Sequence, residues 1–155
     1  GTTARVWLPG AAQAVPPPRV LPTAIEPPRL RVLVIDDDVR VLRVTARMLH
    51  ECDVALADGY QAAVERLCVA REAYDVVLCD LMMPGISGIG LAEEVLRRDP
   101  ALRERMVFMT GGAVTPSSES FLARGDVICV TKPLDMRNLL RLLGEARNRG
   151  PVARP

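Results

Sequence analysis

Residues 75–88 read DVVLCDLMMPGISG: an apolar run, an acidic residue and a loop rich in proline and glycine. The run from Asp75 to Cys79 lacks an alternation of polar and apolar side chains, which is typical of a strand buried on both faces. Ser87 in the loop is a candidate N-cap for a helix that continues to Arg98. A fully buried strand that leads at once into a helix predicts a parallel sheet with helices on both faces.

The same alternation of short apolar runs and amphipathic segments continues in both directions along the chain. Further strands are predicted at 31–35, 53–56, 106–109 and 127–130. Further helices are predicted at 39–50 and at 61–72. Another helix follows the fourth strand and ends at about residue 123, and its start is not defined by the sequence. A last helix is capped by Asp135, and its predicted inward residues are Met136, Leu139, Leu140 and Leu143. This alternation favours right-handed βαβ units, so the predicted class is α/β, a five-stranded doubly wound parallel sheet of order 2-1-3-4-5.

Polar side chains with complementary charges follow the predicted strands, at the edge where ligands bind in doubly wound sheets. They are Asp36, Asp37 and Asp38 after the first strand, Asp80 after the third, Thr110 after the fourth and Lys132 after the fifth. The first and third strands are neighbours in this order, about 4.8 Å apart, so their carboxylates are expected to converge. Like charges this close destabilise the fold unless a cation or a raised pKa relieves them.

These residue types predict phosphoryl chemistry. An oxygen-lined site with two or three carboxylates suits Mg²⁺. Thr110 can donate a hydrogen bond from the opposite side, and Lys132, the only lysine of the sequence, adds a compact positive charge. Asp80 is then placed to act as a nucleophile toward a phosphoryl group, while the cation and Lys132 neutralise charge on the phosphoryl oxygens.

Four blocks of the sequence resemble, in order and spacing, the signature blocks of response-regulator receiver domains: VLVIDDD, VVLCDLMMPGISG, VFMTGG and VICVTKPLD. The resemblance covers residues 30–147. It implies a flavodoxin-like receiver fold in which Asp80 accepts the phosphoryl group. Thr110 and Lys132 are implied to contact that group, and the peptide bond between Lys132 and Pro133 is implied to be cis.

The resemblance also implies a magnesium site. Asp37 and Asp80 would supply carboxylates to the metal, and the backbone carbonyl of Met82 would be a third protein ligand. Asp36 would position the metal through water. By contrast, we interpret Asp38 as a helix cap, which is the common role of an aspartate at this place after a strand.

Two departures from the family pattern concern regulation. Many receivers carry an aromatic residue three positions before the lysine, and Cys129 stands there in this sequence. An aromatic switch is therefore in doubt. Met82 and Gly112 stand at positions that handle the attacking water during dephosphorylation in the family. Neither can orient a water with its side chain, so fast self-dephosphorylation is not expected.

Composition excludes several classes of protein. Of the 155 residues 49% are hydrophobic, whereas only 3% are aromatic and the net charge is +1. A nucleic-acid binder would need a clustered basic face, so no nucleic-acid partner is expected. No apolar run reaches the ~20 residues that span a bilayer, and no signal peptide is recognised. Four unpaired cysteines in apolar runs favour a reducing compartment, and a cytoplasmic location without membrane contact is expected.

The chain divides into four predicted parts. Residues 1–9, GTTARVWLP, resemble the closing strand of a histidine-kinase ATP-binding domain. Residues 10–29 are rich in proline and read as a linker. Residues 30–147 form the receiver domain and 148–155 a tail, with no DNA-binding domain after it. Together these parts resemble the C-terminal piece of a hybrid sensor histidine kinase.

Three functions stay open from the sequence. The first is a phosphorelay receiver that takes phosphate from a kinase phosphohistidine, of the same chain or a dimer partner, and passes it to a histidine phosphotransfer protein. The second is a phosphorylation-gated or pseudo-receiver module that regulates an attached histidine kinase. The third is a phosphohydrolase with an aspartyl nucleophile, which we disfavour because such enzymes place the nucleophile after the first strand. Whether the chain counts as an enzyme is left open, since a receiver promotes its own Mg²⁺-dependent phosphorylation.

Overall fold

The computed structural model describes residues 1–4, 29–111, 116–123 and 127–149. The predicted linker up to residue 28, most of the predicted kinase remnant and residues 150–155 of the predicted tail lie outside these ranges. Gly112 lies outside them too, so its predicted effect on dephosphorylation stays a prediction.

Five parallel strands form one sheet in the order β2-β1-β3-β4-β5, which confirms the predicted topology. The strands are β1 (Arg31–Ile35), β2 (Asp53–Ala57), β3 (Val76–Asp80), β4 (Met106–Thr110) and β5 (Ile128–Thr131). The central strand β3 is buried along its whole length, as its unbroken apolar sequence predicts. The order reverses beside β1 and β3, and this switch point is where doubly wound sheets bind ligands.

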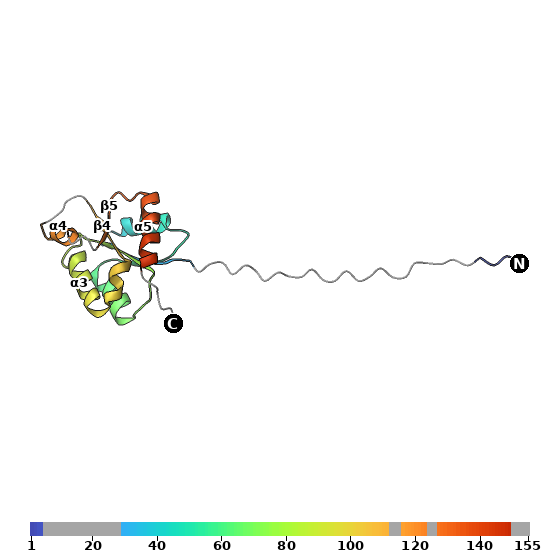
Figure 1. The fold of residues 1–155 in the computed structure, drawn as a ribbon, viewed down its shortest axis with the longest axis horizontal. Helices are drawn as coiled ribbons and strands as arrows, with labels where there is room; N and C mark the ends of the chain where they lie inside the picture. Colours follow the sequence, from blue (N-terminus) through green and yellow to red (C-terminus); the bar gives the residue numbers. More distant parts are fainter. Residues whose placement is uncertain (5–28, 112–115, 124–126, 150–155) are drawn as a thin grey trace.

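Helices cover both faces of the sheet (Figure 1). The helical segments are α1 (Val39–Met48), α2 (Tyr60–Val64), η1 (Glu65–Val69), α3 (Gly88–Arg98), η2 (Pro100–Arg105), α4 (Pro116–Leu122) and α5 (Met136–Arg149). Side chains of α1 and α5 pack on one face, and side chains of α2, η1, α3 and α4 pack on the other. Alternate residues of β1 divide between the two layers, with Val32 and Val34 in the first and Leu33 and Ile35 in the second.

The buried face of α5 differs from the predicted one. Leu139 and Leu143 are buried as expected, but Leu140 is 46% exposed, and Leu142 and Ala146 are buried in its place. Residues three, four and seven positions after Leu139 share its face, whereas Leu140 is turned about 100° away from it. The helix also continues to Arg149, two residues past the predicted domain boundary.

The segment after β2 is less regular than its apolar spacing suggested. It begins as α2 and continues as the π-helical turn η1, where the Ala70 amide donates to the Glu65 carbonyl over 2.7 Å. Arg71 then ends the segment with a φ of 50°, in the left-handed region that non-glycine residues rarely adopt. Neither η1 nor η2 leaves a clear periodic signal in the sequence.

A close approach between α3 and β3 fixes the loop after Asp80. A Cβ atom at Gly88 would lie 2.0 Å from the carbonyl oxygen of Asp80 and 2.9 Å from the Cα of Leu81. The Gly88 amide also donates to the Leu81 carbonyl over 3.1 Å. The first turn of α3 therefore rests directly on the backbone that carries Asp80, and only glycine leaves room for this contact.

Replacing Gly88 with alanine is expected to destabilise the fold by about 2–3 kcal/mol, since neither backbone can move without breaking sheet or helix hydrogen bonds. Urea unfolding measures the change. Gly144→Ala in α5 is the matched control, because nothing lies within 4 Å of a Cβ built there. The control should be neutral or stabilising by up to about 1 kcal/mol through helix propensity. Equal effects of the two substitutions would contradict the close approach.

Candidate functional site

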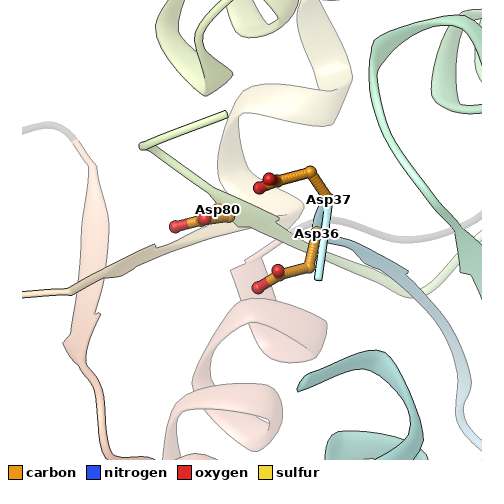
Figure 2. Close-up of side chains that lie close together, drawn as sticks. All are labelled: Asp36, Asp37 and Asp80. Atoms are coloured by element: carbon orange, nitrogen blue, oxygen red, sulfur yellow. The ribbon is translucent and has the colours of Figure 1, made fainter. Parts of the chain in front are cut away.

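Three carboxylates meet at the switch point of the sheet. Asp36 and Asp37 follow β1, and Asp80 is the last residue of the neighbouring strand β3. One carboxylate oxygen from each of the three lies within 4.8 Å of the others. Figure 2 shows the three side chains leaving the strand ends and pointing to the same side. The predicted convergence is thus present in the structure.

The three carboxylates differ in their burial. Asp36 is 1% exposed and Asp80 is 4% exposed, whereas Asp37 is open to solvent. The Oδ1 atom of Asp36 accepts a hydrogen bond from the Asp38 amide over 2.9 Å, which fixes the turn after β1. Burying two carboxylates side by side costs free energy, so a compensating charge is required.

Lys132 supplies part of this compensation. Its Nζ atom lies 2.6 Å from Oδ2 of Asp36 and 3.2 Å from Oδ2 of Asp80, so one ammonium group bridges both buried carboxylates. The Lys132 amide donates to the Thr110 carbonyl over 2.7 Å, which holds the turn after β5 against the end of β4. The peptide bond between Lys132 and Pro133 is cis, as predicted.

Burial and these contacts shift the pKa values of Asp80 and Lys132. Burial raises the pKa of the Asp80 carboxyl above its ordinary value, although Lys132 opposes the shift. Burial alone would lower the pKa of the Lys132 ammonium, but its hydrogen bond with Asp36 and the charge of Asp80 outweigh burial and raise that pKa. Lys132 is therefore a permanent cation, while ionised Asp80 is held at a free-energy cost that a further cation would reduce.

The donor set fits a hard divalent cation. Three carboxylates and one ammonium group leave two negative charges when all are ionised. The Oδ1 atom of Asp80 is buried and has no hydrogen-bond partner among the described residues. The unsatisfied buried oxygen leaves room for a further ligand or reactant at the site, and three converging carboxylates are the kind of donor set that Mg²⁺ prefers.

The remaining predicted site residues lie around this cluster. Thr110 is the last residue of β4 and is nearly buried, and β4 pairs with β3 so that Met109 stands opposite Asp80. Met82 lies two residues after Asp80 with its side chain exposed. Its predicted role as a metal ligand depends on its carbonyl and stays a prediction.

The structural interpretation of Asp38 is confirmed. Asp38 is the N-cap of α1, with its side chain accepting from the Arg40 amide over 2.8 Å. The four cysteines are free. Cys129, at the position of the absent aromatic ring, is partly buried against the layer that contains α3 and α4.

An apolar groove beside Lys132 was not predicted from the sequence. It has a volume of about 300 Å³ and is lined by Val41, Val44 and Met48 of α1 together with Pro133 and Leu134. Val44 is 56% exposed. The available signal was the pattern VRVLRV in α1, which places apolar side chains on more than the one face that packs on the sheet.

Comparison with known proteins gives one family. The response regulator receiver domain pattern matches residues 32–144. Two-component system protein A of Emericella nidulans is 30% identical over 119 residues, which are 75% of this chain and 17% of that protein. Sensor protein GacS of Pseudomonas syringae is 32% identical over 136 residues, which are 81% of this chain and 15% of that protein. The chain thus spans about a sixth of the length of these two relatives.

Solved structures agree on the fold. A response regulator receiver domain protein from Clostridium thermocellum superposes with a TM-score of 0.67 at 23% identity, covering 77% of this chain and 95% of that one. TrrA from Thermotoga maritima, solved with Mg²⁺ and BeF, has a TM-score of 0.62 at 22% identity and covers 76% of this chain and 98% of that one. Among the described residues, no helix is long and apolar enough to cross a membrane.

Asp37→Asn is expected to weaken Mg²⁺ binding at least about tenfold, because it removes one of three converging carboxylates and a full negative charge. Asp37 is exposed, so the fold should be unaffected. Calorimetric titration measures the affinity. The matched control is Asp58→Asn, which alters an exposed aspartate just after β2, outside the cluster. Equal Mg²⁺ affinities for the two variants would contradict a metal site at the cluster.

Proposed function

Because the chain belongs to the response regulator receiver domain family of two-component signal transduction, we propose that it accepts a phosphoryl group on Asp80 from a kinase phosphohistidine. The proposal rests on the different contacts of the two Asp80 carboxylate oxygens. Its Oδ2 atom is held by Lys132, whereas its buried Oδ1 atom has no hydrogen-bond partner among the described residues. One oxygen is thus oriented and the other is available as a nucleophile.

In the proposed transfer, Asp80 Oδ1 forms a bond to phosphorus as the bond from phosphorus to the donor nitrogen breaks. The electron pair of the broken bond stays on that nitrogen. Asp36, Asp37, Asp80 and the Met82 carbonyl would hold Mg²⁺, Asp36 through water, and the ion would neutralise charge on the phosphoryl oxygens. Lys132 keeps its proton and contributes a second positive charge at the same place, and Thr110 donates a hydrogen bond to a phosphoryl oxygen.

Incubation with acetyl phosphate and Mg²⁺, followed by intact mass measurement, tests the acceptor. The parent chain is expected to gain one phosphoryl group, and Asp80→Asn is expected to gain none because the amide cannot act as the nucleophile. Asp58→Asn serves as the control and should behave like the parent. A phosphoryl group on the Asp80→Asn chain would refute Asp80 as the acceptor.

We further propose that the groove beside Lys132 receives a helix of the phosphohistidine-bearing domain. The groove adjoins the acceptor site through Lys132, and its surface is mainly apolar although Arg40 and Thr45 also line it. Such a groove suits the apolar face of an amphipathic helix. A donor helix seated there would bring its histidine to the end of β3, where Asp80 lies.

Val44→Glu should slow phosphotransfer from a phosphorylated histidine domain at least about tenfold, since it buries a charge in the docked groove. Phosphorylation by acetyl phosphate should be unchanged, because the small donor needs no docking surface. Val69→Glu is the matched control, as Val69 is 62% exposed in η1 and does not line the groove. Equal slowing by both variants, or slowing with acetyl phosphate as well, would count against helix docking at this groove.

The source of the phosphoryl group is proposed to be a sensor histidine kinase to which this receiver is attached. The likeness to the sensor protein GacS supports this proposal. On this proposal residues 30–147 form the receiver, residues 1–9 derive from the kinase domain and residues 10–29 connect the two. The receiver would then pass the phosphoryl group to a histidine phosphotransfer protein or, alternatively, regulate the attached kinase.

A further inference from the structure

A cavity opens at the opposite edge of the sheet from Asp80. It has a volume of about 690 Å³ and lies between the end of η1, the start of β3 and the 3₁₀ helix η2. This volume is in the range that holds a small organic ligand. The five residues of β3 separate the two edges by about 13 Å, so the cavity is distinct from the carboxylate site.

The lining of the cavity combines an apolar wall with guanidinium groups. Leu67, Cys68 and Leu102 supply the apolar part, and Arg71, Arg98 and Arg105 supply the cations. Two acidic residues, Glu72 and Asp99, also line it, so the cationic side chains outnumber the acidic ones. Whether the cavity attracts an anion depends on how these acids are already engaged.

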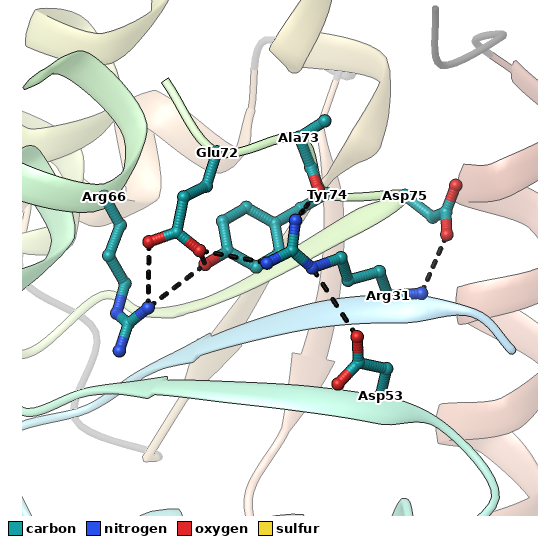
Figure 3. Close-up of polar contacts among 7 residues, drawn as sticks. All are labelled: Arg31, Asp53, Arg66, Glu72, Ala73, Tyr74 and Asp75. Carbon is teal, nitrogen blue, oxygen red and sulfur yellow. Dashed lines mark hydrogen bonds and ion pairs between the residues drawn. The ribbon is translucent and has the colours of Figure 1, made fainter. Parts of the chain in front are cut away.

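Glu72 is fully engaged by other partners. Its Oε2 atom accepts from the Tyr74 hydroxyl over 2.7 Å and lies 3.1 Å from an Arg31 nitrogen, and its Oε1 atom lies 3.0 Å from an Arg66 nitrogen. Figure 3 shows this carboxylate enclosed by the three donors. The Tyr74 hydroxyl, followed by Arg66 and Arg31, lowers the pKa of Glu72 despite its partial burial. Glu72 is therefore shared by two arginines outside the cavity and does not neutralise the cations that line it.

The other acid, Asp99, is engaged less fully than Glu72, and Arg98 shares its carboxylate partner with a second arginine. Asp99 accepts from the Ala101 amide over 3.1 Å and stands 3.8 Å from Arg105. Arg105 donates to the Tyr74 carbonyl over 2.8 Å, which fixes its buried guanidinium against β3. Arg98 shares the single carboxylate of Glu94 with Arg97, so this pair of arginines carries one uncompensated positive charge.

Among the three arginines that line the cavity, Arg71 is the one without a side-chain partner in the described part of the chain. Its side chain makes no hydrogen bond or ion pair with the part of the chain that the structure describes, and it lines the cavity. Its backbone has a φ of 50°, a conformation that glycine adopts without cost and arginine does not. Arg71 is thus an exposed arginine that lines the cavity from a strained backbone position, where the fold alone would favour glycine.

We propose that this cavity binds a small organic phosphate, with the phosphate on the guanidinium groups of Arg71 and Arg98 and the organic part against Leu67, Cys68 and Leu102. Arginine forks match phosphate oxygens in geometry and charge. The apolar wall adds buried area that inorganic phosphate alone cannot use. The site is independent of the acceptor chemistry at Asp80.

The test is a titration of the ¹⁵N-labelled chain with ADP, followed by amide chemical shifts, in buffer with EDTA so that the carboxylate site holds no metal. Submillimolar binding is expected, with shifts confined to residues 67–74 and 98–105. Pyrophosphate should bind more weakly at the same amides, and adenosine should not bind because it lacks the phosphate. Absence of shifts at these amides with both ADP and pyrophosphate at millimolar concentration would overturn the proposal.

Two substitutions and one control locate the ligand. Arg71→Gly and Arg98→Gln are each expected to weaken ADP binding about tenfold or more, as loss of a charged hydrogen bond predicts. Arg71→Gly should keep the fold intact, because glycine tolerates the left-handed conformation, so its loss of binding cannot be assigned to unfolding. Arg97→Gln is the matched control, since Arg97 also pairs with Glu94 but does not line the cavity. Equal weakening by the Arg97 and Arg98 variants would refute the site.

Discussion

The bridge from one lysine to two buried carboxylates is the interaction on which the rest of the structure depends. Lys132 comes from the turn after β5, whereas Asp36 and Asp80 come from the ends of β1 and β3. Two unit charges about 4 Å apart in a medium of effective dielectric ~20 repel by about 4 kcal/mol. The ammonium group offsets this repulsion only in part, and with Asp37 two negative charges remain, which suit a divalent cation.

Most of the fold and the centre of the site could be predicted, because both leave local signals. The unbroken apolar run of β3 indicates a strand buried on both faces, and its neighbours follow from the strand–helix alternation. In a parallel sheet all strands end at one edge, and the predicted strand order makes β1 and β3 neighbours there, so Asp36 and Asp80 meet and Lys132 reaches them from the turn after β5. The helix N-caps Asp38 and Ser87 could likewise be predicted, since capping depends on residue type and position.

The parts that escaped prediction depend on contacts between segments distant in the sequence. Leu140 lies outside the buried face of α5 because the orientation of that helix on the sheet, which no local pattern specifies, selects Leu142 and Ala146 instead. The groove beside α1 and the cavity beside Arg71 each combine residues from separate elements. The left-handed backbone of Arg71 gave no signal either, since glycine is the residue that marks such positions.

Chemical trapping tests most directly that Asp80 is the phosphoryl acceptor. Borohydride reduces an aspartyl phosphate to homoserine, and peptide mass spectrometry then places the altered residue. After phosphorylation with Mg²⁺ present, we expect homoserine at Asp80 alone, because among the described residues its carboxylate is the one that combines an oriented oxygen with an unpartnered buried oxygen. Homoserine at Asp36 or Asp37, or its absence from a chain that has gained a phosphoryl group, would contradict the account.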